Sequence, residues 1–161
     1  MESAERRKGT VRRRVAGPED RAVILELAQR LAEQGMPPWR DAQAMSAFHR
    51  RYADAATAAS GPLECVLVAE DAGRLIGFVH VIETADGLTG EVEGYVATLA
   101  VSSSVEGQGV GRTLMAAAED WSRARGHRLL TLETFAFNDR ARRFYGRLGY
   151  VEETIKLVKE L

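Results

Sequence analysis

Three glycines stand at alternate positions, Gly107, Gly109 and Gly111, directly after an apolar segment rich in β-branched residues. A helical pattern of apolar residues begins immediately after them. The first amides of a helix have no partner within the helix, and the helix dipole adds positive potential at the same end. Glycines also let a ligand approach the backbone closely. A strand, a glycine turn and a helix start therefore indicate a site for a phosphate-bearing ligand.

Two other glycine-rich phosphate loops compete with this interpretation. The Walker loop requires a four-residue gap between its glycines, and then a lysine and a hydroxyl residue, whereas Arg112 and Thr113 follow Gly111 here. We reject it. The dinucleotide fingerprint requires a third glycine at the position of Arg112, although Glu133 lies at roughly the distance expected for its acidic residue. Too little chain follows for the rest of a doubly wound sheet, so this alternative is the weaker one.

The surrounding sequence predicts the elements that must position the loop. Apolar periodicity and turn residues predict helices over residues 18–34, 41–59, 112–125 and 139–148. Strands are predicted over residues 10–15, 65–70, 74–83, 91–101, 129–137 and 150–158. The predicted order is β-α-α-β-β-β-α-β-α-β, with one parallel crossover between residues 91 and 137 and hairpins around it. We therefore expect an α/β (α+β) domain with a mixed sheet.

Length and composition are those of one globular domain. The chain has 161 residues, of which 45% are hydrophobic and 28% charged, and its net charge is −1. No apolar run approaches the roughly 20 residues that a spanning helix needs, and no secretory leader follows Met1. We expect a cytoplasmic protein without a membrane partner, in which residues 1–9 form a disordered tail and residues 10–161 form a single domain.

Other residues that could indicate a ligand have simpler explanations. The basic clusters at residues 6–8 and 12–14 suit a solvated tail and the polar face of a first strand, so we predict no nucleic-acid partner. Cys65 is the only cysteine, which excludes an internal disulfide, and its apolar neighbours are typical of a core strand. The three histidines show no ligand spacing, so we predict no metal site.

The loop and the last helix together resemble the GCN5-related N-acetyltransferase (GNAT) superfamily. The matching features are Leu99-Ala100-Val101, Gly107-Gln108-Gly109-Val110-Gly111-Arg112-Thr113-Leu114, Asn138, Arg140-Ala141-Arg142 and Phe144-Tyr145-Gly146-Arg147-Leu148-Gly149-Tyr150. They occur in the family's order and spacing, and the element order over residues 10–158 is also that of the family. The resemblance implies a GNAT-type mixed sheet flanked by helices on both faces.

One position departs from the family pattern. Glu106 stands three residues before the second-last glycine of the loop, where the family usually has glutamine or arginine. An acidic side chain is unfavourable near a pyrophosphate unless it points away. The departure concerns the side chain and leaves the backbone cradle of the loop intact.

The resemblance implies acetyl-coenzyme A (acetyl-CoA) as co-substrate and direct attack of an amine on its thioester. The pyrophosphate would lie on the loop amides, and the pantetheine arm would pair with the backbone of Leu99 and Val101 like an added strand. This requires the strands that carry Val101 and Leu132 to separate at their carboxyl ends. The implied binding residues are Leu99, Ala100, Val101, Gln108, Gly109, Val110, Gly111, Arg112, Thr113, Asn138, Ala141 and Tyr145.

Direct transfer needs a proton acceptor and a proton donor. A primary amine is mostly protonated at neutral pH, so a base or a water chain must remove a proton, and the leaving thiolate benefits from an acid. Tyr145 matches the phenol that protonates the sulfur in the family. Glu93 is our favoured base, because the resemblance implies that acceptors approach from the side of the central strand where Glu93 stands. Glu91, Glu133 and a water chain without a dedicated base remain alternatives.

The predicted acceptor is a primary amine of a small molecule. The two N-terminal helices and their link are expected to hold it, with an apolar wall of Met36, Trp39, Phe48 and Tyr52. A protein amino terminus or lysine is the alternative acceptor, and an open groove beside Glu93 would favour it. A CoA-binding module without turnover is a further alternative. The resemblance also suggests a homodimer formed through C-terminal strands.

Overall fold

A computed structural model describes residues 11–31, 35–58 and 61–161 of the chain. The predicted tail at residues 1–9 lies outside these described residues. The elements are β1 (Arg12–Val15), the 3-10 turn η1 (Pro18–Asp20), α1 (Arg21–Gln29), α2 (Ala42–Ala58), β2 (Glu64–Asp71), β3 (Arg74–Ala85), β4 (Val92–Val101), the 3-10 turn η3 (Ser103–Val105), α3 (Val110–Ala124), β5 (Leu130–Thr131) and α4 (Asp139–Arg147). Up to α4 the order of helices and strands is the predicted one.

The five strands form one mixed sheet in the order β1-β2-β3-β4-β5. Neighbouring strands are antiparallel except β4 and β5, which are parallel and joined through α3. Ala72 and Gly73 connect β2 to β3 with φ angles of 49° and 78°. Positive φ at both residues of a two-residue loop matches the twist of the flanking strands, so the predicted hairpin closes here. The parallel crossover brings the carboxyl end of β4 to the glycine loop.

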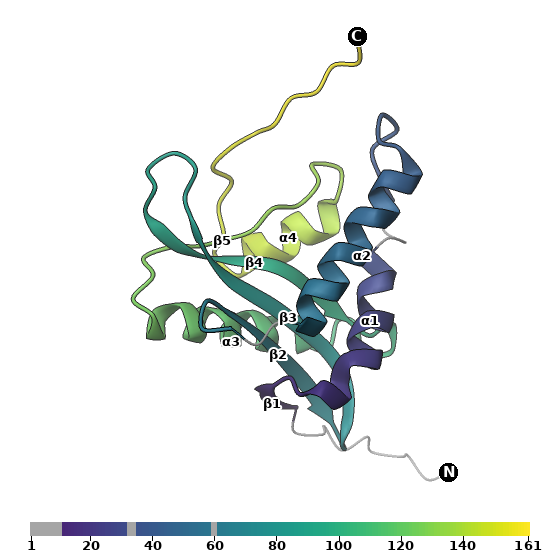
Figure 1. Cartoon of the computed structure of the whole chain (residues 1–161), viewed down its shortest axis with the longest axis vertical. Coiled ribbons are helices and arrows are strands. Elements are labelled where there is room, and N and C mark those ends of the chain that lie inside the picture. Colours follow the sequence, from purple (N-terminus) through teal and green to yellow (C-terminus); the bar gives the residue numbers. More distant parts are fainter. Residues whose placement is uncertain (1–10, 32–34, 59–60) are drawn as a thin grey trace, which may run out of the picture.

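Helices cover both faces of the sheet, as predicted (Figure 1). α1 and α2 pack on one face, where Ile24 and Phe78 are fully buried. α3 packs on the opposite face through Leu114, with α4 beside it. A Cβ on Gly94 of β4 would lie 2.2 Å from the Ser122 hydroxyl oxygen of α3, so this close approach requires glycine. The two packed layers hold β4 in place from both sides.

β4 contains one extra residue, Ala97, opposite two consecutive residues of β3 that pair with Val96 and Thr98. Such a bulge interrupts the strand's alternation of faces. Before it, Gly94 and Val96 point toward α3, and after it Thr98 and Ala100 point toward α1 and α2. Because Gly94 and Val96 face α3, Tyr95 between them faces α1 and α2. Tyr95 before the bulge and Thr98 after it therefore lie on the same face of the sheet.

Two predicted strands differ from the structure. The strand expected over residues 129–137 is only Leu130–Thr131, and the final strand expected over residues 150–158 is absent from the described chain. β5 leaves β4 after two pairs, so the residues that follow have no ladder to continue. From Val151 onward every residue after α4 is exposed, and no strand of the described chain lies beside the segment. A lone extended segment cannot pair its backbone, which explains why residues of strand type form no strand here.

Candidate active site

β4 and β5 pair only at their beginnings. Gly94 pairs with Leu130 and Tyr95 with Thr131, and the described residues contain no partner strand for the rest of that edge of β4. The predicted separation of the two strands is therefore present. Leu99, Ala100 and Val101 lie in the unpaired length. A free strand edge exposes backbone groups that can pair with an extended ligand.

The glycine loop connects this free edge to α3. Gly107 and Gly109 have φ angles of 76° and 87°, and nothing lies within 4 Å of a Cβ built on either residue. Both glycines are thus needed for their backbone conformation, and they leave open space above the loop. Gly109 caps α3, so the amides of the first helical residues lack an internal partner. These are the amides of Val110, Gly111 and Arg112.

Two of the six predicted loop amides already have partners. The Gln108 amide donates to the Val105 carbonyl at 3.2 Å, and the Thr113 amide donates to the Gly109 carbonyl at 3.0 Å. The Thr113 hydroxyl donates to the same Gly109 carbonyl at 3.2 Å, so it stabilises the helix start. The anion-binding capacity of the loop is therefore concentrated in the amides between them.

Gly111 has a packing role as well. Its Cβ would lie 3.1 Å from the Phe144 ring, so α4 crosses close over the start of α3. A hydrogen bond from Arg140 to Glu106 at 2.8 Å also places the first turn of α4 near the loop. Asn138 caps α4, because its side-chain oxygen accepts the Ala141 amide at 3.0 Å. The predicted site residues Asn138 and Ala141 are thus held together at one helix end.

Tyr145 lies one turn further along α4 and packs against the core cluster of α3. Its ring meets Phe144 and Tyr150 edge-on, with centroid distances of 5.1 and 5.8 Å. Burial raises the pKa of Tyr145 to about 12, because the phenolate is poorly solvated there. The phenol is therefore protonated at neutral pH and able to act as a proton donor.

The candidate bases have distinct environments. Glu93 is 7% exposed, and its Oε1 accepts the Thr131 hydroxyl at 2.8 Å, while Oε2 is buried without a partner among the described residues. Glu91 is exposed and accepts two hydrogen bonds from Arg128, which lowers the pKa of Glu91. Glu133 is exposed. Only Glu93 presents a free carboxylate oxygen to the protein interior within the described chain.

Glu93 does not lie beside the residues predicted to bind the acetyl group. Leu99 follows it by six residues, or about 20 Å along an extended strand. Tyr95 follows Glu93 by two residues on the same face of β4, before the bulge, and burial, the Glu133 carboxylate and the Tyr52 phenol together raise the pKa of Tyr95 above its ordinary range. Tyr95 was not among the predicted site residues. Its spacing of two from Glu93 could have identified it, since alternate residues of a strand share a face.

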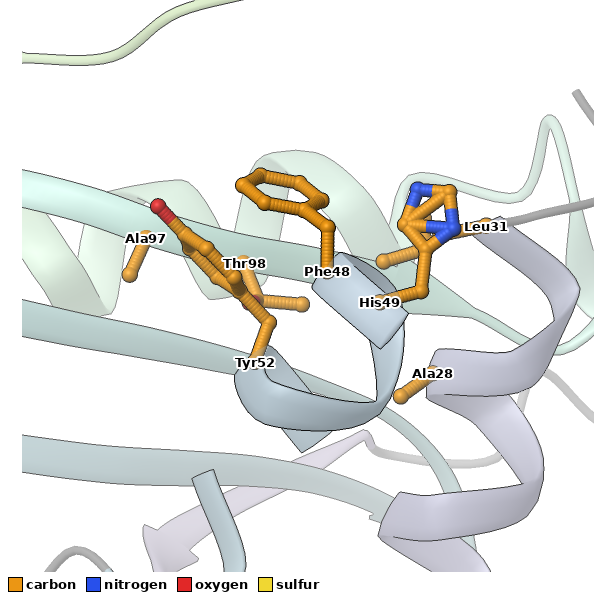
Figure 2. A pocket seen from close by; sticks show the side chains of 7 residues that line it. All are labelled: Ala28, Leu31, Phe48, His49, Tyr52, Ala97 and Thr98. Atoms are coloured by element: carbon orange, nitrogen blue, oxygen red, sulfur yellow. The ribbon is translucent and has the colours of Figure 1, made fainter. Parts of the chain in front are cut away.

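An aromatic pocket opens at the bulge of β4 (Figure 2). Phe48, His49 and Tyr52 project from α2, opposite Ala97 and Thr98 of β4. The pocket measures about 90 Å³, and the Thr98 hydroxyl is buried without a partner among the described residues. Burial lowers the pKa of His49, so its imidazole is neutral at pH 7. This pocket can accept only a small group, such as the end of a larger molecule.

A second, larger cavity of about 400 Å³ adjoins the first, because Phe48 lines both. Its other walls include Trp39, Asp41 and Arg51. Of the four residues predicted to form an apolar wall, Trp39, Phe48 and Tyr52 line these two cavities, and Met36 is exposed nearby in the chain. Residues 39–41, just before α2, and the exposed side of α2 thus provide room beyond the narrow pocket.

Glu106 forms an ion-pair cluster at the mouth of the loop. Its carboxylate accepts Arg140 at 2.8 Å and Arg30 at 3.4 Å. Arg30 also donates to the Val101 carbonyl at 2.7 Å. Arg140, and to a lesser extent Arg30, lowers the pKa of Glu106. The acidic side chain that departs from the family pattern therefore stays ionised and is neutralised by two arginines.

Other site types find no support in the described part of the chain. No group of histidine, cysteine or acidic residues in it has the arrangement of a metal site. None of its helices has the length and apolarity needed to cross a bilayer.

The fold and the sequence define the class of this protein. The acetyltransferase (GNAT) family model matches residues 26–150, so the chain belongs to the GNAT family. This match includes β4, the glycine loop, and the helix that carries Asn138 and Tyr145.

Three similar proteins illustrate its place in the family. The uncharacterized N-acetyltransferase YhfO of Bacillus subtilis is 33% identical over 89 residues, which are 55% of this chain and 60% of that protein. N-alpha-acetyltransferase 30 of Schizosaccharomyces pombe is 37% identical over 87 residues, 54% of this chain and 57% of that protein. The matches thus span less than two thirds of either relative. AAC(6')-Iy, solved with a CoA-based bisubstrate analog, has a TM-score of 0.68 at 19% identity, covering 94% of this chain and 99% of that one.

Proposed function

We propose that the chain is an acyltransferase that moves an acetyl group from acetyl-CoA to the primary amine of a small molecule. The observation that carries this proposal is the early separation of β4 and β5, which leaves a free strand edge leading directly into the glycine loop. The aromatic pocket at the β4 bulge lies on the sheet face covered by α1 and α2, close to the same stretch of strand. A donor groove and an acceptor pocket therefore share one strand.

The donor site suits acetyl-CoA in shape and chemistry. The space above Gly107 and Gly109 is open, and the first amides of α3, which have no partner within the helix, would hold the pyrophosphate. The edge of β4 at Leu99 and Val101 offers backbone groups for the pantetheine amides, although the Val101 carbonyl already accepts a hydrogen bond from Arg30. Bound there, acetyl-CoA supplies an activated acetyl thioester. The Tyr145 phenol holds the proton that the departing sulfur requires.

The acceptor amine must lose a proton to a base or to a chain of water molecules before it attacks the thioester. Glu93 lies too far along β4 to touch an amine in the aromatic pocket, so we propose that it is the end of a relay. Tyr95 follows Glu93 on the same face of β4, and the hydroxyl of Thr131, which pairs with Tyr95 on β5, already donates to Glu93 at 2.8 Å. Water molecules can complete such a chain. Transfer through water without Glu93 remains the alternative within the same function.

The acceptor assignment rests on the size of the cavities. The narrow pocket has room for an aminomethyl group, and the larger cavity beside Trp39 has room for the rest of a small amine. Similarity to N-alpha-acetyltransferase 30 favours the second candidate, a protein amino terminus. The exposed rim at Trp39 and Phe48 could bind the side chain of a first residue. A module that binds CoA without turnover is the third candidate.

We also propose that the chain forms a homodimer through its C-terminal segment. Val151, Ile155 and Leu157 are each more than three quarters exposed in the single chain. Apolar side chains in an extended segment are costly to leave in water, and a second copy can cover them.

Calorimetric titration with acetyl-CoA, and with NAD in parallel, tests the donor assignment. We expect micromolar affinity for acetyl-CoA and none for NAD. A panel of aminosugars, polyamines, aromatic amines and peptides with free amino termini, assayed by thiol release, then identifies the acceptor class. Preference for NAD, or binding of neither ligand, would overturn the acetyltransferase proposal. Donor binding without turnover on any amine would support the inactive module.

A further inference from the structure

The ion-pair cluster at Glu106 joins three separate elements around the donor groove. Arg30 follows α1, Glu106 lies in the loop between η3 and α3, and Arg140 is in the first turn of α4. Each is adjacent to part of the proposed donor site. Arg30 binds the carbonyl of Val101, Glu106 precedes Gly107, and Arg140 lies between Asn138 and Ala141 in the sequence.

The charges of this cluster do not balance. One carboxylate faces two guanidinium groups, which leaves one excess positive charge at the mouth of a groove suited to phosphate. Arg30 uses one amino group on Val101, and its contact with Glu106 is long at 3.4 Å, so much of its five-donor capacity is unused. Arg140 is 72% exposed on its side chain and can turn toward the groove. Guanidinium groups bind phosphate oxygens in paired geometry.

These contacts indicate a role for the Glu106 side chain in the donor site. Its carboxylate is an anion held between two arginines beside an anion-binding loop, which is the arrangement that a bound phosphate would have. A carboxylate and a phosphate cannot both occupy that arrangement without strong repulsion. Binding of one requires the other to move.

We propose that Arg30 and Arg140 are phosphate-binding residues of the donor site, and that Glu106 occupies them when no donor is bound. Donor binding exchanges the Glu106 carboxylate for a phosphate of CoA, and Glu106 lowers the affinity for the donor by competing for the arginines. This inference rests on the proposed function, because it presupposes that CoA binds at the loop. The phosphate concerned is either the pyrophosphate or the 3′-phosphate of CoA.

The test is a calorimetric double-mutant cycle with CoA as the probe. Glu106→Gln is expected to lower the Kd of CoA by about fivefold, the scale of an exposed ion pair. Arg140→Ala is expected to raise the Kd by a similar factor in the Glu106→Gln background, since the arginine then contacts phosphate alone. Asp120→Asn is the matched control, because Asp120 pairs with Arg13 and Arg123 on the outer face of α3.

The outcomes separate this inference from the function on which it rests. If the unaltered chain does not bind CoA, both fail. If it binds CoA and Glu106→Gln leaves or raises the Kd, the exchange is excluded. If Arg140→Ala has no effect once Glu106 is replaced, Arg140 serves only to neutralise Glu106 and the inference is wrong. Repeating the cycle with dephospho-CoA identifies the phosphate: an Arg140 effect that persists assigns the pyrophosphate, and one that disappears assigns the 3′-phosphate.

Discussion

Glu91 and Glu93 are two residues apart, yet the fold gives them different chemistry. Glu91 is tied to Arg128 in solvent, whereas Glu93 is buried with one free oxygen. The sequence favours Glu93 only through resemblance, because Arg128 lies 37 residues from Glu91 and its contact depends on the turn before β5. The donor-loop residues were predictable for the opposite reason. Their glycines and helix start are consecutive in the chain, so local conformation alone brings them together.

Replacement of Tyr145 by phenylalanine tests the proposed proton donor. We expect kcat to fall by about a hundredfold, the usual scale for a lost general acid, because the sulfur must leave unprotonated. The Kd of acetyl-CoA should change little, since the ring and its packing remain. Steady-state assays by thiol release, with calorimetry for the donor, provide both values.

Tyr150→Phe is the matched control for that variant. Tyr150 stacks edge-on against Tyr145 but does not occupy the position of the family's phenol. We expect its turnover to stay near that of the unaltered chain. Equal activity of the two variants would remove Tyr145 from the reaction.

Helices and hairpins were predicted better than the strands at the far edge of the sheet. α3 and α4 follow from periodicity and caps within one segment, and the β2–β3 hairpin follows from its turn residues. β5 is short because it pairs with β4 at only two positions. The segment after α4 could form a strand only beside a partner strand, and the described chain contains none for it. Strand-type residues without a partner remain irregular, and a local pattern carries no information about that partner.

A buried histidine in the β2–β3 pair makes the free energy of unfolding depend on pH. His80 is 2% exposed and binds Glu64 on the neighbouring strand at 3.0 Å. Burial lowers the pKa of His80 below 6.5, although Glu64 opposes the shift. The unfolded chain therefore takes up a proton at a higher pH than the folded chain. Stability is full above pH 6.5 and should fall as the pH drops below it, by at most about 1.4 kcal/mol per pH unit for this group.

Urea denaturation at pH 7.5, 6.5 and 5.5 measures this dependence. His80→Gln removes the titrating group, so the free energy of unfolding should vary less with pH in the variant than in the parent chain. His49, whose pKa is also lowered by burial, leaves a residual slope of the same sign. An unchanged slope in His80→Gln would show that other groups cause the acid sensitivity.

At the scale of the whole molecule, the segment after Tyr150 is held to α4 by the ion pair of Glu152 with Arg142 but packs little apolar surface against the fold. After Tyr150 every residue is exposed, and the chain runs away from the sheet (Figure 1). If this segment forms the proposed dimer, sedimentation should show a dimer at micromolar concentration. The double variant Ile155→Asp/Leu157→Asp should then be monomeric, because buried carboxylates would face an apolar surface.

Leu88→Asp provides the control for this change in surface charge. Leu88 is 77% exposed, as is Ile155, but lies in the turn between β3 and β4. The Leu88 variant should remain a dimer. A parent chain that sediments as a monomer at every concentration would contradict the homodimer proposal.

The extra residue in β4 reverses the orientation of every side chain that follows it in the strand. Upstream of Ala97 the odd-numbered residues, Glu93 and Tyr95, face α1 and α2, and downstream the even-numbered Thr98 and Ala100 do so. An alignment that shifts this strand by one residue exchanges the face toward α3 with the face toward α1 and α2. Deletion of Ala97 would exchange the faces to which residues 98–101 point. A conservative substitution at Ala97 would leave their orientation unchanged. The orientation of these side chains therefore depends on the number of residues in this stretch and not on which residue occupies position 97.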